Sequence, residues 1–112
     1  MSEINIKGEL LSHVEGMYNV KAVQLKLERY TERLKSVQLF HLPDGYSEVQ
    51  LKDFLRDIDT TYDNGYGNQM LYGFIWWKDG TWSSRYEYDG AEEWVHHSLP
   101  IYPLNRKEMM EL

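Results

Sequence analysis

The sequence predicts an α+β fold in which a small antiparallel sheet, formed by a C-terminal β-meander, packs against one or two helices. Three observations lead to this prediction. Residues 71–77 (LYGFIWW) form a β-rich run, and residues 81–88 (TWSSRYEY) alternate between two kinds of side chain. The pair Asp79-Gly80 separates these runs, as in a two-residue hairpin turn. Residues 47–60 carry the signals of an amphipathic helix.

The helix has a recognisable beginning. Ser47 and Gln50 have the spacing of a capping box, in which the two side chains satisfy amide donors that lack a helical partner. Apolar residues then follow at steps that place them on one stripe: Leu51, Phe54, Leu55 and Ile58. We expect this stripe to face the core and the helix to stop near Thr60, before the glycine-rich residues 63–68.

The first half of the chain is less decisive. Residues 3–17 show helical spacing of apolar side chains, but Gly8 and Gly16 weaken a helix there. Residues 20–37 fit an amphipathic helix with Asn19 as N-cap, and they also alternate as a strand would. We prefer the helix and keep the strand as the alternative. Residues 37–42 (VQLFHL) are predicted to form a strand that ends at the turn of residues 43–45.

A two-residue turn fixes which side chains of the hairpin share a face. It places Trp77 opposite Trp82 and Lys78 opposite Thr81. One face then carries Leu71, Ile75, Trp77, Trp82, Tyr86 and Tyr88, and the other carries Tyr72, Phe74, Trp76, Ser83, Arg85 and Glu87. A second turn at Asp89-Gly90 leads to residues 91–98, which form either a third strand or a short helix.

Length and composition limit the class of protein. The 112 residues suit one domain, 1–112, and the formal net charge is −6. An acidic chain is a poor general binder of nucleic acid or anionic membranes, but it suits a partner with a basic surface. The chain has no cysteine, which excludes disulfides and thiolate metal sites. Without a signal-peptide pattern or a long apolar run, we expect a cytosolic protein and no membrane partner.

The densest stretch is residues 79–94, DGTWSSRYEYDGAEEW. Its plainest interpretation is structural: Arg85 can pair with Glu87, Glu92 or Glu93, and Asp89 can cap its own turn. Its functional interpretation is a recognition patch for a partner protein. The candidate partner-binding residues are Trp76, Arg85, Glu87, Asp89 and Trp94.

Catalytic and metal-binding patterns are weak. His96 and His97 are adjacent, so on a strand they point to opposite faces, and neither accompanies a zinc-binding motif. His13 and His41 are isolated in the sequence. The chain also lacks the motifs of a nucleophile elbow, a P-loop or a dinucleotide fold. We therefore predict a protein without metal or cofactor that is not an enzyme, and keep a small nuclease using a histidine and carboxylates as a remote alternative.

The order of several motifs resembles small bacteriophage and prophage proteins of mostly unknown activity. These are Y-D-x-G-Y-G at 62–67, L-Y-G-x-I at 71–75, D-G-T-W-x-x-R-x-E-Y-D-G-x-E-x-W at 79–94, and P-x-x-P at 100–103. The chain departs from the pattern after the second Asp-Gly, where it has Ala91-Glu92-Glu93-Trp94 instead of Ser-Glu-Trp-Trp. The resemblance implies a phage setting, in which small acidic proteins often bind and block a host protein.

The leading hypothesis is thus a phage-type protein that inhibits or redirects a host factor, such as a defence or transcription protein. The alternative is a sponge for a nucleotide signal or another small ligand, with stacked aromatic rings and Arg85 as the phosphate partner. Self-association, including a role in the virion, is a further alternative.

Overall fold

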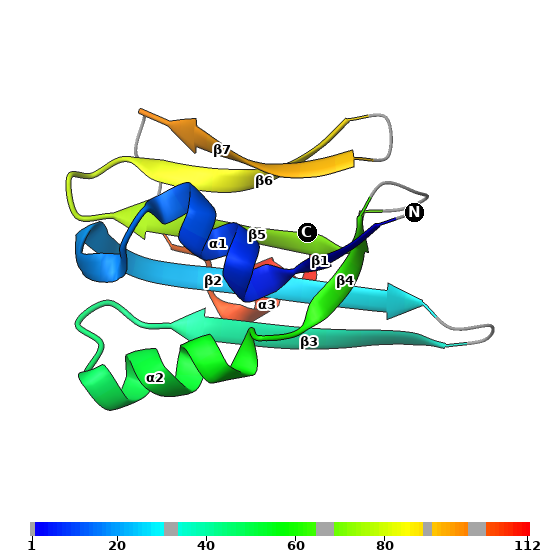
Figure 1. Ribbon diagram of the computed structural model, residues 1–112, viewed down its shortest axis with the longest axis horizontal. Coiled ribbons are helices and arrows are strands. Elements are labelled where there is room, and N and C mark those ends of the chain that lie inside the picture. Colours follow the sequence, from blue (N-terminus) through cyan, green and yellow to red (C-terminus); the bar gives the residue numbers. More distant parts are fainter. Residues whose placement is uncertain (1, 31–33, 65–68, 89–90, 99–102) are drawn as a thin grey trace.

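The computed structural model describes residues 2–30, 34–64, 69–88, 91–98 and 103–112, and it confirms the predicted α+β class. A five-stranded antiparallel sheet has the order β3-β2-β5-β6-β7, and β1 and β4 form a separate two-stranded sheet (Figure 1). The elements are β1 (Ser2–Asn5), α1 (Ile6–Val14), the 3₁₀ turn η1 (Met17–Asn19), β2 (Val20–Tyr30), β3 (Lys35–Leu42), α2 (Glu48–Asp57), β4 (Thr61–Asn64), β5 (Leu71–Trp77), β6 (Trp82–Tyr88), β7 (Ala91–His97) and α3 (Arg106–Met110). None of these helices is long and apolar enough to cross a membrane.

The preferred helix over residues 20–37 is wrong. Residues 20–30 form β2, which lies between β3 and β5, and nearly all of its side chains are buried. Leu25 and Leu27 point to one face of the sheet, while Gln24 and Lys26 point to the other and are buried as well. The helical spacing of apolar residues was misleading because a central strand covered on both faces need not show strict alternation of apolar and polar residues. The strand predicted at 37–42 is confirmed within β3.

One face of the sheet, which we call the helix-covered face, is packed against α1, α2 and β4 (Figure 1). α1 contributes Ile6 and Leu10 to this core, and Asn5 caps the helix by accepting a hydrogen bond from the Gly8 amide at 2.8 Å. The predicted capping box of α2 is present, with Ser47 and Gln50 bonded in both directions. Phe54 and Ile58 of the predicted stripe are buried, and Leu51 and Leu55 pack against the core.

The hairpin between β5 and β6 differs from the prediction by one residue. Its turn is a three-residue loop, in which the Gly80 amide donates to the Trp77 carbonyl at 3.1 Å and Gly80 has φ of 89°. The pairing is therefore Trp76 with Trp82, instead of Trp77 with Trp82. A shift of one residue exchanges the two faces of a strand. Trp77 consequently shares the helix-covered face with Arg85, and Trp76 lies on the opposite face.

The opposite face is covered in part by the C-terminal residues 103–112, and we call it the C-terminal face. Lys26 is fully buried there and donates to the main-chain oxygen of Leu112 at 2.8 Å. Gln24 exchanges hydrogen bonds with the main chain of Leu104. Residues 91–97 form the third strand of the meander, β7, and not a helix. α3, which belongs to the C-terminal residues, lies behind the sheet in Figure 1, on the side away from α1 and α2.

Candidate functional site

Four of the five residues that the sequence grouped as a recognition patch belong to the described part of the chain, and they do not form one surface. Arg85 and Trp94 are cross-strand neighbours, buried on the helix-covered face. Trp76 is buried on the C-terminal face, where it stacks on Phe74 at a ring-centroid distance of 5.6 Å. Glu87 is exposed near the end of β6. Asp89 lies outside the described residues. Trp76 was grouped with Arg85 because the prediction assumed a two-residue turn, and the longer loop places it on the other face.

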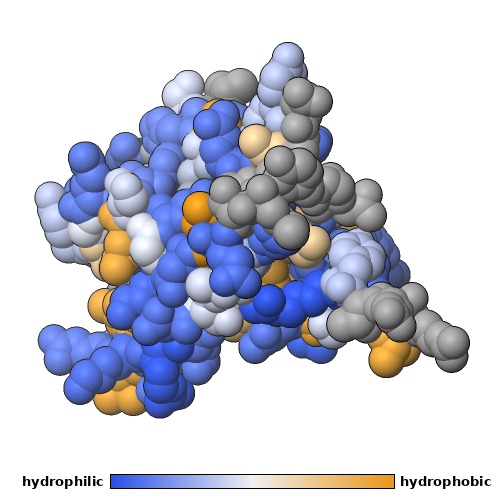
Figure 2. Space-filling view, turned by 45° about the vertical axis from the view of Figure 1, so that its right-hand side comes forward, coloured by the Kyte–Doolittle hydropathy of each residue, from blue (hydrophilic) through white to orange (hydrophobic). Residues whose placement is uncertain are grey.

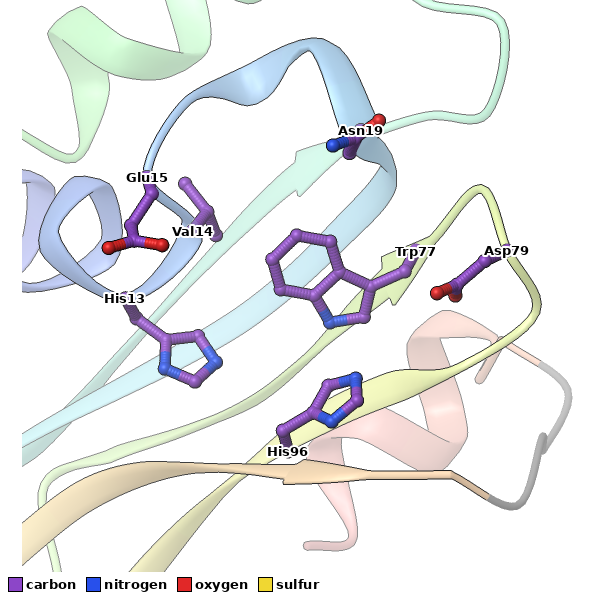
Figure 3. Close-up of a pocket in the computed structure, with 7 residues that line it drawn as sticks. All are labelled: His13, Val14, Glu15, Asn19, Trp77, Asp79 and His96. Atoms are coloured by element: carbon purple, nitrogen blue, oxygen red, sulfur yellow. The ribbon is translucent and has the colours of Figure 1, made fainter.

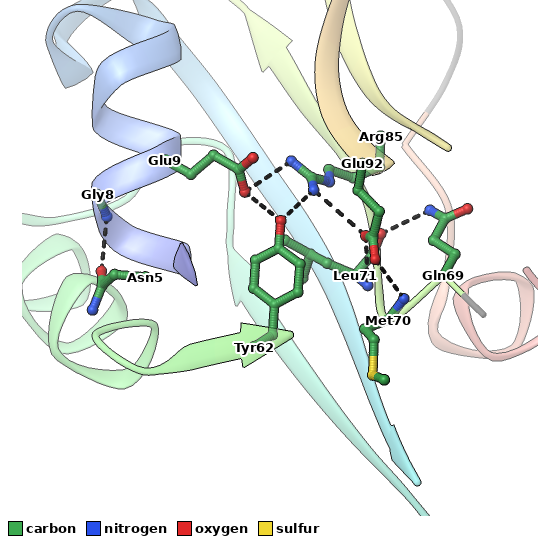
Figure 4. Close-up of polar contacts among 9 residues, drawn as sticks. All are labelled: Asn5, Gly8, Glu9, Tyr62, Gln69, Met70, Leu71, Arg85 and Glu92. Atoms are coloured by element: carbon green, nitrogen blue, oxygen red, sulfur yellow. Dashed lines mark hydrogen bonds and ion pairs between the residues drawn. The ribbon is translucent and has the colours of Figure 1, made fainter. Parts of the chain in front are cut away.

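Arg85 is instead the centre of an internal polar cluster (Figure 4). One of its terminal nitrogens lies 3.1 Å from Glu9 Oε1, and the other donates to the Tyr62 hydroxyl at 2.6 Å. The same nitrogen lies 3.5 Å from Glu92 Oε1, which confirms the predicted contact with Glu92. The guanidinium also lies over the Trp94 ring, 5.1 Å from its centroid. The Arg85 side chain is only 1% exposed, so a phosphate in solution cannot reach it.

The cluster connects segments that are far apart in the sequence. Tyr62 from β4 donates its hydroxyl proton to Glu9 of α1 at 2.6 Å. Glu92 of β7 accepts from the backbone amides of Met70 and Leu71 at 2.9 and 3.1 Å. Arg85 joins these two carboxylates from β6. The arrangement fastens α1, β4 and the start of β5 to the meander, which is a structural role.

Burial governs the titration of the cluster. It raises the pKa of Glu92 above its ordinary value, although the amides of Met70 and Leu71 and the Arg85 charge act in the opposite direction. Burial also raises the pKa of Tyr62 far above its ordinary value, opposed by Arg85 and assisted by the hydrogen bond to Glu9. Tyr62 therefore remains a proton donor at every physiological pH.

The exposed aromatic groups of the meander lie at the far end of β6, on the C-terminal face. Tyr86 is 48% exposed and Tyr88 is 72% exposed. Their cross-strand partners on β7 are Glu93 and Ala91, both exposed. These residues line a shallow pocket of about 210 Å³. We call Tyr86, Tyr88, Ala91 and Glu93 the tyrosine surface.

A larger cavity of about 450 Å³ lies at the opposite end of the hairpin, and Figure 3 shows the seven residues that line it. We call it the histidine pocket. His13, Val14 and Glu15 come from the end of α1, Asn19 from the end of η1, Trp77 and Asp79 from the β5–β6 hairpin, and His96 from β7. The sequence treated His13 as isolated, because no local pattern predicts that residues 13 and 96 line one pocket.

Two hydroxyl groups connect these side chains to the sheet. Ser83 Oγ lies 2.9 Å from His13 Nε2, and Thr81 Oγ1 lies 2.9 Å from His96 Nε2. The contact between Ser83 and His13 has the reach of a nucleophile and its base. Ser83 is fully buried, however, so a substrate in the pocket cannot reach its hydroxyl.

The side chains of the adjacent residues His96 and His97 point to opposite faces of the sheet, as predicted for neighbours on a strand. His96 pairs with Ser83 on the helix-covered face, while His97 pairs with Trp82 and stacks on its ring at 4.0 Å. Within the described residues, no three histidine, aspartate or glutamate side chains are placed to hold a metal ion.

Comparison of the chain with protein-family models, with curated proteins and with solved structures gave no match. The resemblance to phage proteins therefore rests on the sequence motifs alone.

Proposed function

We propose that this protein acts without catalysis, by binding a partner protein through the tyrosine surface. The observation that carries the proposal is the exposure of Tyr86 and Tyr88 side by side with Glu93 at the end of a hairpin. Tyrosine rings supply a large contact area at small cost in conformational entropy, and they are enriched at the centres of protein interfaces.

Charge favours a basic partner. The chain carries a net charge of −6, which attracts a basic protein and speeds its encounter. At the tyrosine surface, a lysine or arginine of the partner would stack on a tyrosine ring and pair with the Glu93 carboxylate. On the face seen in Figure 2, hydrophobic residues form small, separate patches among hydrophilic ones. Recognition by aromatic and charged groups fits such a surface better than recognition by a broad apolar area.

The motifs shared with phage proteins supply the setting of the proposal. The partner would then be a host protein, such as a defence or transcription factor, that is inhibited or redirected in the host cytosol. A nucleotide sponge is less well supported, because Arg85, its expected phosphate ligand, is buried against Glu9, Tyr62 and Glu92.

The test is capture of a host protein from bacterial cytosol by three immobilised forms of the chain. They are the wild type, the double variant Tyr86→Ser/Tyr88→Ser, and the control Tyr18→Ser, which removes a tyrosine that is 73% exposed elsewhere. We expect the wild type and the control to retain the same protein. The double variant should bind it at least tenfold more weakly, because truncating a central aromatic residue typically costs about 2 kcal/mol or more.

Urea unfolding provides the control for folding. Both variants change exposed side chains, so the free energy of unfolding should stay within about 0.5 kcal/mol of the wild type. Raised salt should weaken capture, since the contact is partly electrostatic. Equal capture by all three forms, or no stoichiometric partner at all, would refute the proposal.

A further inference from the structure

The histidine pocket is an independent feature at the other end of β6 from the tyrosine surface. Figure 3 shows the Trp77 ring in its centre, with His13 and His96 along one side, Asn19 on another, and the Asp79 carboxylate turned toward the indole. The hydroxyl groups of Thr81 and Ser83 determine which nitrogen of His96 and of His13 is a donor and which is an acceptor.

The proton on His96 follows from its contact with Thr81. The Thr81 hydroxyl donates its single proton to Asp79 Oδ1, at 2.5 Å. The 2.9 Å contact between Thr81 Oγ1 and His96 Nε2 must then carry the proton of His96. In the neutral form of His96, Nδ1 is then a lone-pair acceptor. Asp79 also accepts from the Thr81 amide, and the hydrogen bonds from Thr81 hold its pKa below the ordinary value, so it remains ionised.

The proton on His13 follows from its contact with Ser83. The Trp77 indole N–H donates to Ser83 Oγ at 3.0 Å. Ser83 is fully buried, so its hydroxyl proton needs an acceptor inside the protein, and His13 Nε2 lies 2.9 Å away. His13 is therefore neutral with its proton on Nδ1. Burial is the first cause that lowers the pKa of His13, and the Arg85 charge acts in the same direction, which favours the same neutral form.

Acceptors and negative charge thus dominate the pocket. Glu15 and Asp79 bring two carboxylates, and His96 Nδ1 adds a neutral acceptor. The nearby cation Arg85 is already paired with Glu9 and Glu92. Trp77 offers a ring face, the best of the aromatic side chains for holding a cation. The complementary ligand is a planar cation with several N–H donors.

We propose that the histidine pocket binds a guanidinium group, stacked on Trp77 and hydrogen-bonded to Asp79. A guanidinium matches a carboxylate with two donors in one plane, which the compact ammonium of lysine does not. The group can come from a free small molecule or from an arginine side chain of a polypeptide. The proposal does not depend on the tyrosine surface.

The test is a titration followed by amide and indole N–H shifts in NMR spectra. The probes are arginine amide, the blocked peptide Gly-Arg-Gly, and lysine amide as the control for charge. We expect saturable shifts of the Trp77 indole and the His96 amide with arginine amide, at an affinity at least tenfold above that of lysine amide. Tighter binding of the peptide would identify an arginine of a polypeptide as the source, and exclusion of the peptide would identify a free small molecule.

Matched variants locate the contact. Asp79→Asn keeps an oxygen for the bond from Thr81 but removes the charge. It should lower the affinity for arginine amide at least fivefold. Glu15→Gln at the rim provides a second variant if the turn does not tolerate the first. Asp53→Asn on α2 is the control of equal charge and should bind as the wild type does, as should Tyr86→Ser/Tyr88→Ser. Equal affinity for lysine amide, the absence of shifts at Trp77, or full affinity in both pocket variants would overturn the proposal.

Discussion

Arg85 and Tyr86 are neighbours in the chain but lie in opposite environments. The Arg85 side chain is 1% exposed and holds two carboxylates between the sheet and α1, while Tyr86 is 48% exposed on the other face. Strand alternation separates them. The difference shows that the residue type most often linked with recognition, a central arginine among aromatic rings, is here buried within the fold, and that the exposed aromatic groups at this end of β6 are tyrosines.

The largest expected effect on stability comes from removing the buried residue of this pair, Arg85. Arg85→Met should lower the free energy of unfolding by about 3–5 kcal/mol, because it leaves Glu9 and Glu92 without their cation. The control is Arg56→Met on α2, which removes an arginine whose side chain is 71% exposed and paired with Asp53. That substitution should cost at most about 1 kcal/mol. Urea unfolding measures both values.

A second variant separates charge from packing. Adding Glu9→Gln to Arg85→Met removes a carboxylate that has lost its cation, while Glu92 keeps its bonds from the Met70 and Leu71 amides, so it should restore about 1 kcal/mol of the loss. Equal costs for Arg85→Met and Arg56→Met would show that the internal cluster does not stabilise the fold as described.

A smaller effect is expected on the exposed side. Glu93→Lys places a positive charge beside Tyr86. It should lower the affinity for the captured basic partner about tenfold, or about 1.4 kcal/mol, and leave the free energy of unfolding unchanged. Asp57→Lys on α2 makes the same change in net charge away from the tyrosine surface. A binding assay at low and high salt compares the two. If both reversals weakened binding equally, overall charge would be the cause and not the local contact.

The smallest effect concerns the dependence of stability on pH. The pKa of His13 in the folded protein lies below its ordinary value of 6.5, with burial as the main cause. As the pH falls below about 6.5, the unfolded chain therefore takes up a proton before the folded chain does, and stability is lost. His13→Gln should reduce this loss of stability. Unfolding curves recorded between about pH 5 and pH 7, on either side of the ordinary histidine pKa of about 6.5, measure it. The exposed control His41→Gln should leave the slope as it is in the wild type.

Local signals in the sequence were sufficient for part of the fold. The capping box at Ser47 and Gln50 predicted α2, and the alternation of residues 81–88 predicted β6. The predicted pairing of the hairpin was wrong by one residue, because Asp79-Gly80 also fits a three-residue loop with a glycine at positive φ. Because of this one-residue difference, Trp76 lies on the face opposite Arg85, and not on the same face as predicted.

The other failures have a non-local cause. β2 is buried on both faces, and the covering of Gln24 and Lys26 by residues 104 and 112 has no trace in the local pattern. The contacts of Arg85 with Glu9 and Tyr62 likewise join segments that only the tertiary fold brings together. The sequence offered Glu92 as one of three acidic partners for Arg85, because these residues belong to one hairpin, and the structure selects Glu92.

The most direct test of the central claim is hydrogen–deuterium exchange of the protein with and without its captured partner. The account predicts that binding protects the end of the β6–β7 hairpin around Tyr86 and Glu93, and that it leaves the amides near Glu9 and Tyr62 unchanged. Protection centred on α2 or on β3, with none near Tyr86, would contradict the assignment of the tyrosine surface as the site of partner binding.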